Sequence, residues 1–425
     1  MHRLLKMLVL FGLSCSVLLA QEPKATELPG KPFFIKKTWI IGGEGNWDYL
    51  TLDPNALQLF IAHGPRVQVV DVNSGSPAGE VTGLHDAHGI ALDAEGQFGY
   101  VTDGSTNEVK VFDRSSFQIV ASVPVGRNPR AVIFEPASGL VFAICPDTIA
   151  QEGRIPRHTS TGQRVFDPFI ASTVTVIDVE THKRIADLLL PGKLGFAQAD
   201  GKGSVFINIT DRNQIAAFNA QDFAAQLRKL ATGSATDNAR APKGDRAAGG
   251  VPTLTIDWSG TAQNPPPIPS PVHIFRLGMG CISPRGLVVD GDHQRLFAAC
   301  DNQKMEVLNT GTGEIVTTLP TGPGTDAIGY DPQRGLIYTS NGGGLGSVTI
   351  IRQTVTDSYA VIQELPTKQR ARTLAVNPTN GEVYLVTGLE GFDLNKKGAG
   401  GSAYSLPVVQ AEPVKGSFQV LVVGN

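Results

Sequence analysis

The sequence lacks the short motifs that mark the common nucleotide, haem and serine-hydrolase sites. Its 425 residues hold no P-loop, no dinucleotide fingerprint opening a βαβ unit, no C-x-x-C-H and no G-x-S-x-G. The glycine run at 342–346 joins two predicted strands and opens no helix, so it does not predict a phosphate cradle. Function therefore has to be sought in side chains that a fold brings together.

Charge and cysteine are also scarce. Charged residues make up 18% of the chain and cysteines number 4, whereas there are 48 glycines and 28 prolines. Few charges and many turn residues favour short strands joined by tight turns. The apolar content of 41% argues against global disorder. The net charge of -3 predicts no bulk attraction to nucleic acid or to an anionic membrane.

A long apolar run is missing after the first twenty residues. Arg3 and Lys6 precede the apolar stretch 8–19, which is too short to span a bilayer comfortably, and Ala20 closes it. We expect residues 1–20 to be a secretory signal whose removal changes the net charge to -5 (34 minus 39). No other segment is long enough to span a membrane, so we expect a secreted or periplasmic protein.

An apolar pattern repeats seven times, at about 40 residues per unit. The copies are WDYLTLDP (47–54), AHGIALDA (87–94), PRAVIFEP (129–136), LGFAQADG (194–201), PRGLVVDG (284–291), TDAIGYDP (325–332) and ARTLAVNP (371–378). Further short apolar strands follow each copy and give four strands to a unit. The pattern predicts an all-β fold, a single seven-bladed β-propeller of four-stranded antiparallel blades over residues 34–425. The strand expected at 37–43 completes the last blade and closes the ring.

Each copy ends in a turn that can be read from its residue types. Asp331, Glu135 and Asn377 are each followed by Pro and, four residues on, by Gly. The first side chain accepts hydrogen bonds from the turn backbone, Pro presets φ, and Gly takes a left-handed conformation. We therefore interpret these residues, and Asp53 with them, as turn-formers.

The repeated pattern resembles the YVTN-type, or YncE-like, family of β-propeller repeats. The motif stands as Tyr100-Val-Thr-Asp103 and, more loosely, as Tyr338-Thr-Ser-Asn341. The resemblance covers nearly all of the chain after the leader and implies the fold. It leaves function open, because such propellers are binding scaffolds and only some relatives are enzymes. Three insertions depart from the plain pattern, at 146–171, 220–272 and 388–417.

One position of the repeat is polar in almost every copy. It lies five residues before the turn residue, at the start of the strand expected to line the central channel. Its occupants are Asp48, His88, Arg130, Gly195, Arg285, Asp326 and Arg372. We expect the six polar side chains to ring one mouth of the channel. His63 ends a strand on the same face, and we add it to the predicted ligand-binding residues.

Two interpretations of this ring stay open. Ion pairs between neighbouring blades, such as Asp326 with Arg372, can simply tie a propeller together. Converging arginines also suit a carboxylate or a phosphate, and the insertions at 146–171 and 388–417 add basic residues on the same face. We expect a locally basic pocket there, with a small anionic ligand or a protein partner.

Metal-assisted chemistry is the other possibility for this mouth. His85 and His88 are three residues apart, a spacing that converges on a metal only in a helix or a tight loop. We predict no cofactor and leave a divalent ion to one alternative, a lactonase-like hydrolase. In that alternative Asp48, His88 or Asp326 activates a water molecule.

The cysteines predict one disulfide. Cys281 precedes the inner strand of the fifth unit and Cys300 ends the next strand, so folding that hairpin brings both to one face. A bond between Cys281 and Cys300 suits an oxidising compartment and leaves Cys145 free and buried.

The sequence thus favours an exported propeller that binds an anionic ligand or a partner, and leans away from an enzyme. The hydrolase is one alternative. A protein-interaction scaffold that uses the proline-rich part of 220–272 is another. The ligand and the oligomeric state are not predicted.

Overall fold

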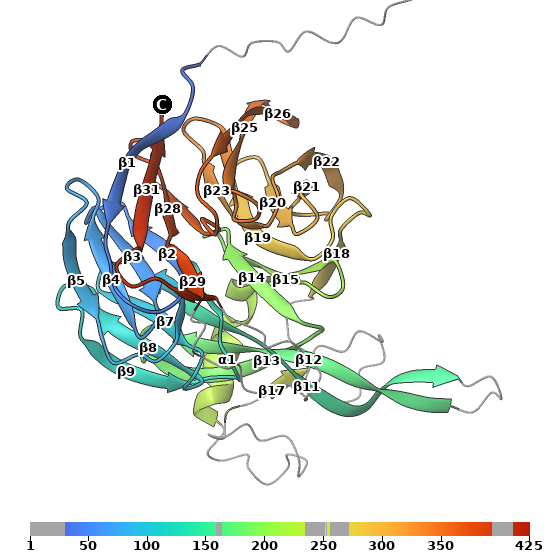
Figure 1. Cartoon of the computed structure of the whole chain (residues 1–425). Helices are drawn as coiled ribbons and strands as arrows, with labels where there is room; N and C mark the ends of the chain where they lie inside the picture. Colours follow the sequence, from blue (N-terminus) through green and yellow to red (C-terminus); the bar gives the residue numbers. More distant parts are fainter. Residues whose placement is uncertain (1–29, 159–163, 234–250, 252, 256–271, 393–410) are drawn as a thin grey trace, which may run out of the picture. The chain divides into compact units, whose positions relative to one another are not determined.

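The computed structural model describes residues 30–158, 164–233, 251, 253–255, 272–392 and 411–425 (Figure 1). The chain divides into a unit Met1–Lys31 and a unit Pro32–Asn425, and all the strands of the described residues belong to the second. The expected leader, residues 1–20, lies outside the described residues. Within the described part of the chain, no helix has the length and apolar character needed to cross a membrane.

Seven sheets, here called blades 1 to 7, make up the fold, so the predicted propeller is confirmed. Six have four strands, and in blade 3 a short fifth strand joins the four of the blade. Blade 1 holds β2 Trp47–Asp53, β3 Gln58–His63, β4 Arg66–Asp71 and β5 Pro77–Val81. Blade 2 holds β6 Ala87–Leu92, β7 Phe98–Asp103, β8 Glu108–Asp113 and β9 Ile119–Pro124. Blade 3 holds β10 Ala131–Glu135, β11 Leu140–His158, β12 Arg164–Asp178 and β13 Lys183–Pro191.

The remaining blades follow the same order. Blade 4 holds β14 Leu194–Ala199, β15 Ser204–Ile209, β16 Gln214–Asn219 and β18 His273–Arg276. Blade 5 holds β19 Pro284–Asp290, β20 Arg295–Cys300, β21 Lys304–Asn309 and β22 Ile315–Pro320. Blade 6 holds β23 Thr325–Asp331, β24 Leu336–Asn341, β25 Ser347–Val355 and β26 Ser358–Pro366. Blade 7 holds β27 Leu374–Val376, β28 Val383–Thr387, β31 Gln419–Gly424 and, at its outer edge, β1 Phe34–Ile40.

Ring closure depends on β1. This strand pairs antiparallel with β31, with Thr38 opposite Leu421, and gives blade 7 its fourth strand. Side chains then pack between blades 7 and 1: the Trp47 ring, 2% exposed, lies 5.6 Å from the Phe418 ring. The expected closure by the N-terminal strand is confirmed, and it removes a sheet edge at the junction.

The turns after the inner strands have the expected chemistry. Asp331 Oδ1 accepts hydrogen bonds from the backbone N–H groups of Gln333 at 3.1 Å and Arg334 at 3.2 Å. Gly335 follows with φ of 60°, a left-handed conformation that favours glycine. Asp53 accepts two backbone bonds in its own turn. The turns that these carboxylates stabilise lie on the face of the propeller opposite the ring position.

The insertions contain additional elements. Strands β11 and β12 continue past their blade as a long hairpin (Figure 1). The 220–272 insertion begins with α1 Ala220–Gly233, and β17 Thr253–Thr255 pairs in parallel with β13 at the outer edge of blade 3. In the third insertion β29 Glu390–Phe392 pairs with β30 Ala411–Pro413. The proline-rich residues of 256–271 lie outside the described part.

Candidate functional site

The ring position lies where the inner strands begin. Asp48, His88, Arg285 and Asp326 lie in β2, β6, β19 and β23, while Arg130 and Arg372 lie just before β10 and β27. Their contacts link them into one network. We call Asp48, His88, Arg130, Arg285, Asp326 and Arg372 the mouth ring, and the face that carries it the mouth face.

His88 lies between two carboxylates. Its Nδ1 is 2.7 Å from Asp48 Oδ2 and its Nε2 is 2.9 Å from Asp86 Oδ2. Both contacts are hydrogen bonds only when each ring nitrogen carries a proton. Arg130 Nη1 lies 3.4 Å from His88 Nδ1, and Arg130 Nε donates to Asn128 Oδ1 at 3.0 Å. Of the ring arginines, Arg130 alone has no carboxylate partner in the described part of the chain.

Arg372 is held loosely between two carboxylates. Its nitrogens lie 3.8 Å from Asp48 Oδ1 and 3.6 Å from Asp326 Oδ2, beyond ordinary hydrogen-bond distance. Its Nε is buried and has no hydrogen-bond partner among the described residues. Arg285, by contrast, donates to Asp301 Oδ2 at 2.8 Å. The guanidinium of Arg372 therefore keeps unused donor capacity at the mouth.

A pair of aromatic rings crosses the channel directly below the mouth ring. Tyr49, next to Asp48, comes from blade 1, and Phe196, next to Gly195, comes from blade 4. Their rings stack with centroids 4.9 Å apart. Burial raises the pKa of the Tyr49 hydroxyl well above its usual value, and the negative charges of Asp326 and Asp48 add to the effect. Tyr49 thus adds a neutral hydroxyl to the charged mouth.

Asp326 is the perturbed carboxyl of the mouth ring. Burial raises the pKa of Asp326, Arg372 counteracts the rise, and the charge of Asp48 adds to it. Asp326 has no hydrogen-bond donor among the described residues, and its raised pKa makes it a better proton acceptor than a surface carboxylate.

Below the aromatic pair the inner strands enclose a cavity of about 370 Å³. All seven blades line it, mostly with apolar side chains such as Leu52, Phe134 and Val376, together with Gln198 and Tyr330. The mouth ring does not line it. Tyr49 and Phe196 line this cavity and neighbour ring positions in the sequence, so the pair lies between the charged mouth and the channel.

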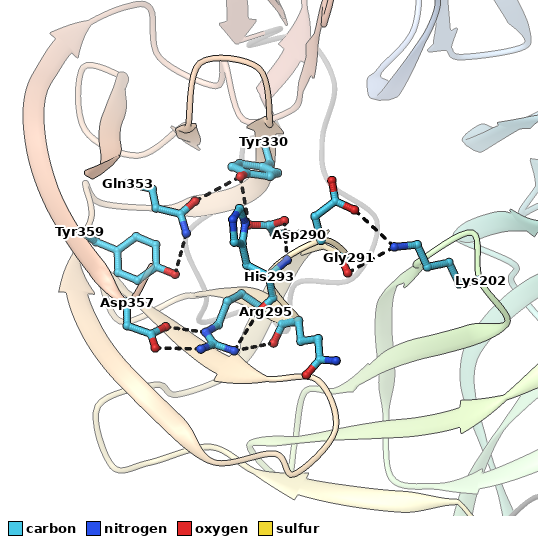
Figure 2. A network of polar contacts seen from close by, with 11 residues as sticks. Lys202, Asp290, Gly291, His293, Arg295, Tyr330, Gln353, Asp357 and Tyr359 are labelled. Carbon is cyan, nitrogen blue, oxygen red and sulfur yellow. Dashed lines mark hydrogen bonds and ion pairs between the residues drawn. The ribbon is translucent and has the colours of Figure 1, made fainter. Parts of the chain in front are cut away.

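Charged pairs on the opposite face include a network whose contacts are shorter than those of Arg372 (Figure 2). Arg295 on blade 5 makes a two-point contact with Asp357 on blade 6, at 2.5 and 2.8 Å, which lowers the pKa of the Asp357 carboxyl. In the same network Tyr330 of blade 6 donates to Asp290 of blade 5 at 3.0 Å. These contacts join neighbouring blades through short bonds.

Arg114 makes a similar connection between blades 1 and 2. Its guanidinium contacts Asp53 and lies 3.3 Å from Asp93 Oδ1, and all three side chains are less than a tenth exposed. Arg334 of blade 6 donates to the carbonyl oxygens of Pro378 and Thr379 of blade 7. The opposite face therefore carries inter-blade contacts within hydrogen-bond distance, whereas both Arg372 contacts are longer. The Nε atoms of Arg114 and Arg372 are alike in having no hydrogen-bond partner among the described residues.

His63 is separate from the mouth ring. It is 1% exposed, and its nitrogens lie 2.6 Å from Gln68 Oε1 and 3.1 Å from the Gly45 carbonyl oxygen. Its ring packs 4.0 Å from that of Phe418 of blade 7. Burial lowers the pKa of His63. These contacts place it in the packing between blades 7 and 1.

The cysteines and Asp103 of the YVTN-like motif make contacts within the fold and do not belong to the mouth ring. Cys281 and Cys300 are joined in a disulfide and Cys145 is free and buried. Asp103 accepts backbone hydrogen bonds from His85 at 2.9 Å and Asp86 at 3.1 Å, and so holds the loop that presents Asp86 to His88. No group of three His, Cys, Asp or Glu suited to a metal ion occurs in the part of the chain that the structure describes.

The mouth differs in two ways from the sequence-based expectation. Asp86 and Asp301 come from neighbouring loops and balance the arginines, so the described mouth is mixed in charge and not basic. The side chains of the basic residues expected at 154–164 and 396–397 lie outside the described residues. Tyr49 and Phe196 were missed, although each directly follows a ring position in the sequence.

Comparisons with known proteins support the fold and do not indicate a function. No family model matches the sequence, and no curated protein matches it. Among solved structures, a chain of the "Crystal Structure of Mitotic Checkpoint Complex" matches with a TM-score of 0.56 and 12% identity, over 89% of this chain and 95% of that chain. At this identity the likeness shows that both chains share a propeller fold.

Proposed function

We propose that the protein is a binding protein whose mouth ring takes a small ligand bearing a carboxylate. The observation that carries the proposal is Arg372, which is 37% exposed and whose nearest carboxylates stay at 3.6 and 3.8 Å. The exposed part of its guanidinium can donate to an anionic oxygen that enters the mouth. Arg130 and the Tyr49 hydroxyl are further hydrogen-bond donors at or next to ring positions of the mouth face.

The contrast between the two faces supports this proposal over a purely structural ring. Inter-blade pairs on the opposite face are short, both where the two side chains are buried, as with Arg114 and Asp53, and where one is exposed, as with Arg295 and Asp357. Arg372 is 37% exposed and is not bonded in that way. Its arrangement suits recognition of an incoming anion better than attachment of one blade to the next.

A thermal-shift series tests the proposal. Succinate, phosphate and glucuronate are titrated against the wild type, Arg372→Gln, and Arg334→Gln as a matched control on the opposite face. A ligand at 100 times its Kd stabilises the native state by about 2.7 kcal/mol, so a bound anion gives a clear shift. We expect the shift to disappear in Arg372→Gln and to persist in Arg334→Gln. Equal shifts in all three proteins would refute the mouth as the site.

A hydrolase at the same mouth is the second candidate, and Asp326 is the observation that favours it. Both nitrogens of His88 are engaged by carboxylates and Asp48 contacts His88, whereas Asp326 has a raised pKa and only the loose contact with Arg372. Asp326 would then accept a proton from the attacking water. Lactone hydrolysis followed in a pH-stat, with Asp326→Asn as the inactive control, decides between binding alone and turnover.

Export and membership of the YVTN-type family are proposals as well. They are supported by the apolar leader at 8–19 and by Tyr100-Val-Thr-Asp103. Sequencing the N-terminus of the protein recovered outside the cytoplasm tests export, with Gln21 as the expected first residue. The interaction scaffold built on 256–271 concerns residues that the structure does not describe.

A further inference from the structure

The mouth ring contains two arginines that form no hydrogen bond to a carboxylate of the described residues. The nearest carboxylate oxygens to Arg372 lie at 3.6 and 3.8 Å, and Arg130 is exposed and has no carboxylate partner in this part of the chain. Arg285, the third arginine, donates to Asp301 Oδ2 at 2.8 Å. A guanidinium presents five N–H donors in a planar fork that matches the two oxygens of a carboxylate. The mouth ring therefore offers two places for an anionic oxygen and not one.

The loop before β10 holds the side chain of Arg130 in place through one of its nitrogens. Arg130 Nε donates to Asn128 Oδ1 at 3.0 Å, and Asn128 Nδ2 donates to Asp147 Oδ1, also at 3.0 Å. The backbone N–H of Asn128 donates to Asn107 Oδ1 at 2.7 Å. The contact with Asn128 uses Nε alone, so the two terminal nitrogens keep donors for a ligand. A guanidinium that is already oriented loses less conformational freedom when it binds.

A short series of contacts connects these two arginines across blades 1 and 2. Arg130 Nη1 lies 3.4 Å from His88 Nδ1, and His88 Nδ1 lies 2.7 Å from Asp48 Oδ2. The other oxygen of the same carboxylate, Asp48 Oδ1, lies 3.8 Å from Arg372 Nη2. Arg130 precedes β10 of blade 3 and Arg372 precedes β27 of blade 7, and the inner strands of blades 7, 1, 2 and 3 contact one another in that order. Both guanidinium groups are therefore within reach of one small molecule.

We propose that the ligand of the mouth ring is a dicarboxylate, with one carboxylate on Arg372 and the other on Arg130. The carbon chain between the two carboxylates lies beside His88 and Asp48. This inference rests on the proposed function and adds the class of ligand, since a ligand with one carboxylate engages only one of the two arginines.

The carboxylates of the mouth are compatible with a ligand of two negative charges because most of them already have close partners. These pairs are Asp48 and Asp86 with His88, at 2.7 and 2.9 Å, and Asp301 with Arg285, at 2.8 Å. The remaining carboxylate, Asp326, has only the contact of 3.6 Å with Arg372. The attraction for an anion therefore comes mainly from Arg130 and Arg372, and a ligand with two charges uses both of them.

Calorimetric titration with matched diacids and monoesters tests the inference. The ligands are succinate, glutarate, adipate and suberate, each beside its monomethyl ester, which keeps the chain length and removes one charge. The proteins are the wild type, Arg372→Gln, Arg130→Gln, and Arg127→Gln as control. Arg127 is exposed in the same loop as Arg130 and has no partner among the described residues, so its substitution removes the same charge from the same face.

We expect at least one diacid of the series to bind the wild type about tenfold or more tightly than its monoester, because a second charge-assisted contact forms. In Arg130→Gln this preference for the diacid disappears, while the Kd of the monoester stays unchanged. In Arg372→Gln the Kd of both ligands rises. The control Arg127→Gln keeps the preference.

Three outcomes would overturn the inference. If no diacid binds more tightly than its monoester, or the preference persists in Arg130→Gln, while Arg372→Gln weakens both ligands, the inference fails and the proposed function stands. If Arg127→Gln removes the preference as fully as Arg130→Gln does, the second charge acts through the general field of the face, and the inference fails as well. If Arg372→Gln changes the Kd of no ligand, or no ligand of the series binds, the proposed function fails together with the inference.

Discussion

Replacing Arg114 by Met should destabilise the protein far more than replacing Arg372 by Met. Arg114 connects blades 1 and 2 through Asp53 and Asp93, and all three side chains are less than a tenth exposed. Removing one member of a buried charged group leaves the others without compensation and costs about 3–5 kcal/mol. Arg372 is 37% exposed and makes only contacts longer than hydrogen bonds, so its loss should cost less than about 1 kcal/mol.

Urea unfolding followed by fluorescence gives the difference in the free energy of unfolding, and scanning calorimetry gives the difference in Tm. Unfolding entropy is about 2.1 cal/mol/K per residue, which for a propeller of this size converts 3–5 kcal/mol into a fall in Tm of about 4–6 °C. The m-value should stay constant, because neither substitution changes the surface exposed on unfolding. Equal losses for the two variants would refute the distinction between bonded inter-blade arginines and a mouth arginine kept for a ligand.

Three further predictions concern titration and the cysteines. Because the pKa of Asp326 is raised in the folded state, the protein loses stability as the pH rises from the unfolded pKa through the folded pKa. Asp326→Asn should therefore raise the free energy of unfolding at pH 7 and flatten its dependence on pH. A lower free energy of unfolding at pH 7 would contradict this. Replacing both Cys281 and Cys300 by Ala opens a loop of sequence separation 19 and should cost about 3 kcal/mol in urea unfolding, and no change would argue against the bond. Burial raises the pKa of the Cys145 thiol, so native protein should resist iodoacetamide and react once unfolded; rapid native labelling would show an accessible thiolate.

The fold follows from the sequence because its signals are local and repeated. Each blade has the same apolar strands, and turn-formers such as Asp331 recur at the same register, so a single copy can be checked against six others. The register also places Asp48, His88 and Asp326 at equivalent strand starts. A one-residue error in that register would have moved these side chains to the other side of their strands.

Contacts across the ring could not be predicted in the same way. Tyr49 and Phe196 meet because blades 1 and 4 face each other across the channel, and this depends on closure and not on local pattern. His63 is buried by Phe418, which lies 355 residues later in the chain. Asp86 and Asp301 come from loops whose course the repeat does not determine, so the balanced charge of the mouth emerged only from the structure.

The most direct test of the proposed function is a crystal structure of the protein grown with bromosuccinate, whose bromine gives an anomalous signal. The proposal predicts bromine in the mouth, with a ligand carboxylate at hydrogen-bond distance from the Arg372 guanidinium, and loss of that signal in Arg372→Gln. Bromosuccinate bound only elsewhere, with Arg372 still unbonded between Asp48 and Asp326, would contradict the proposal.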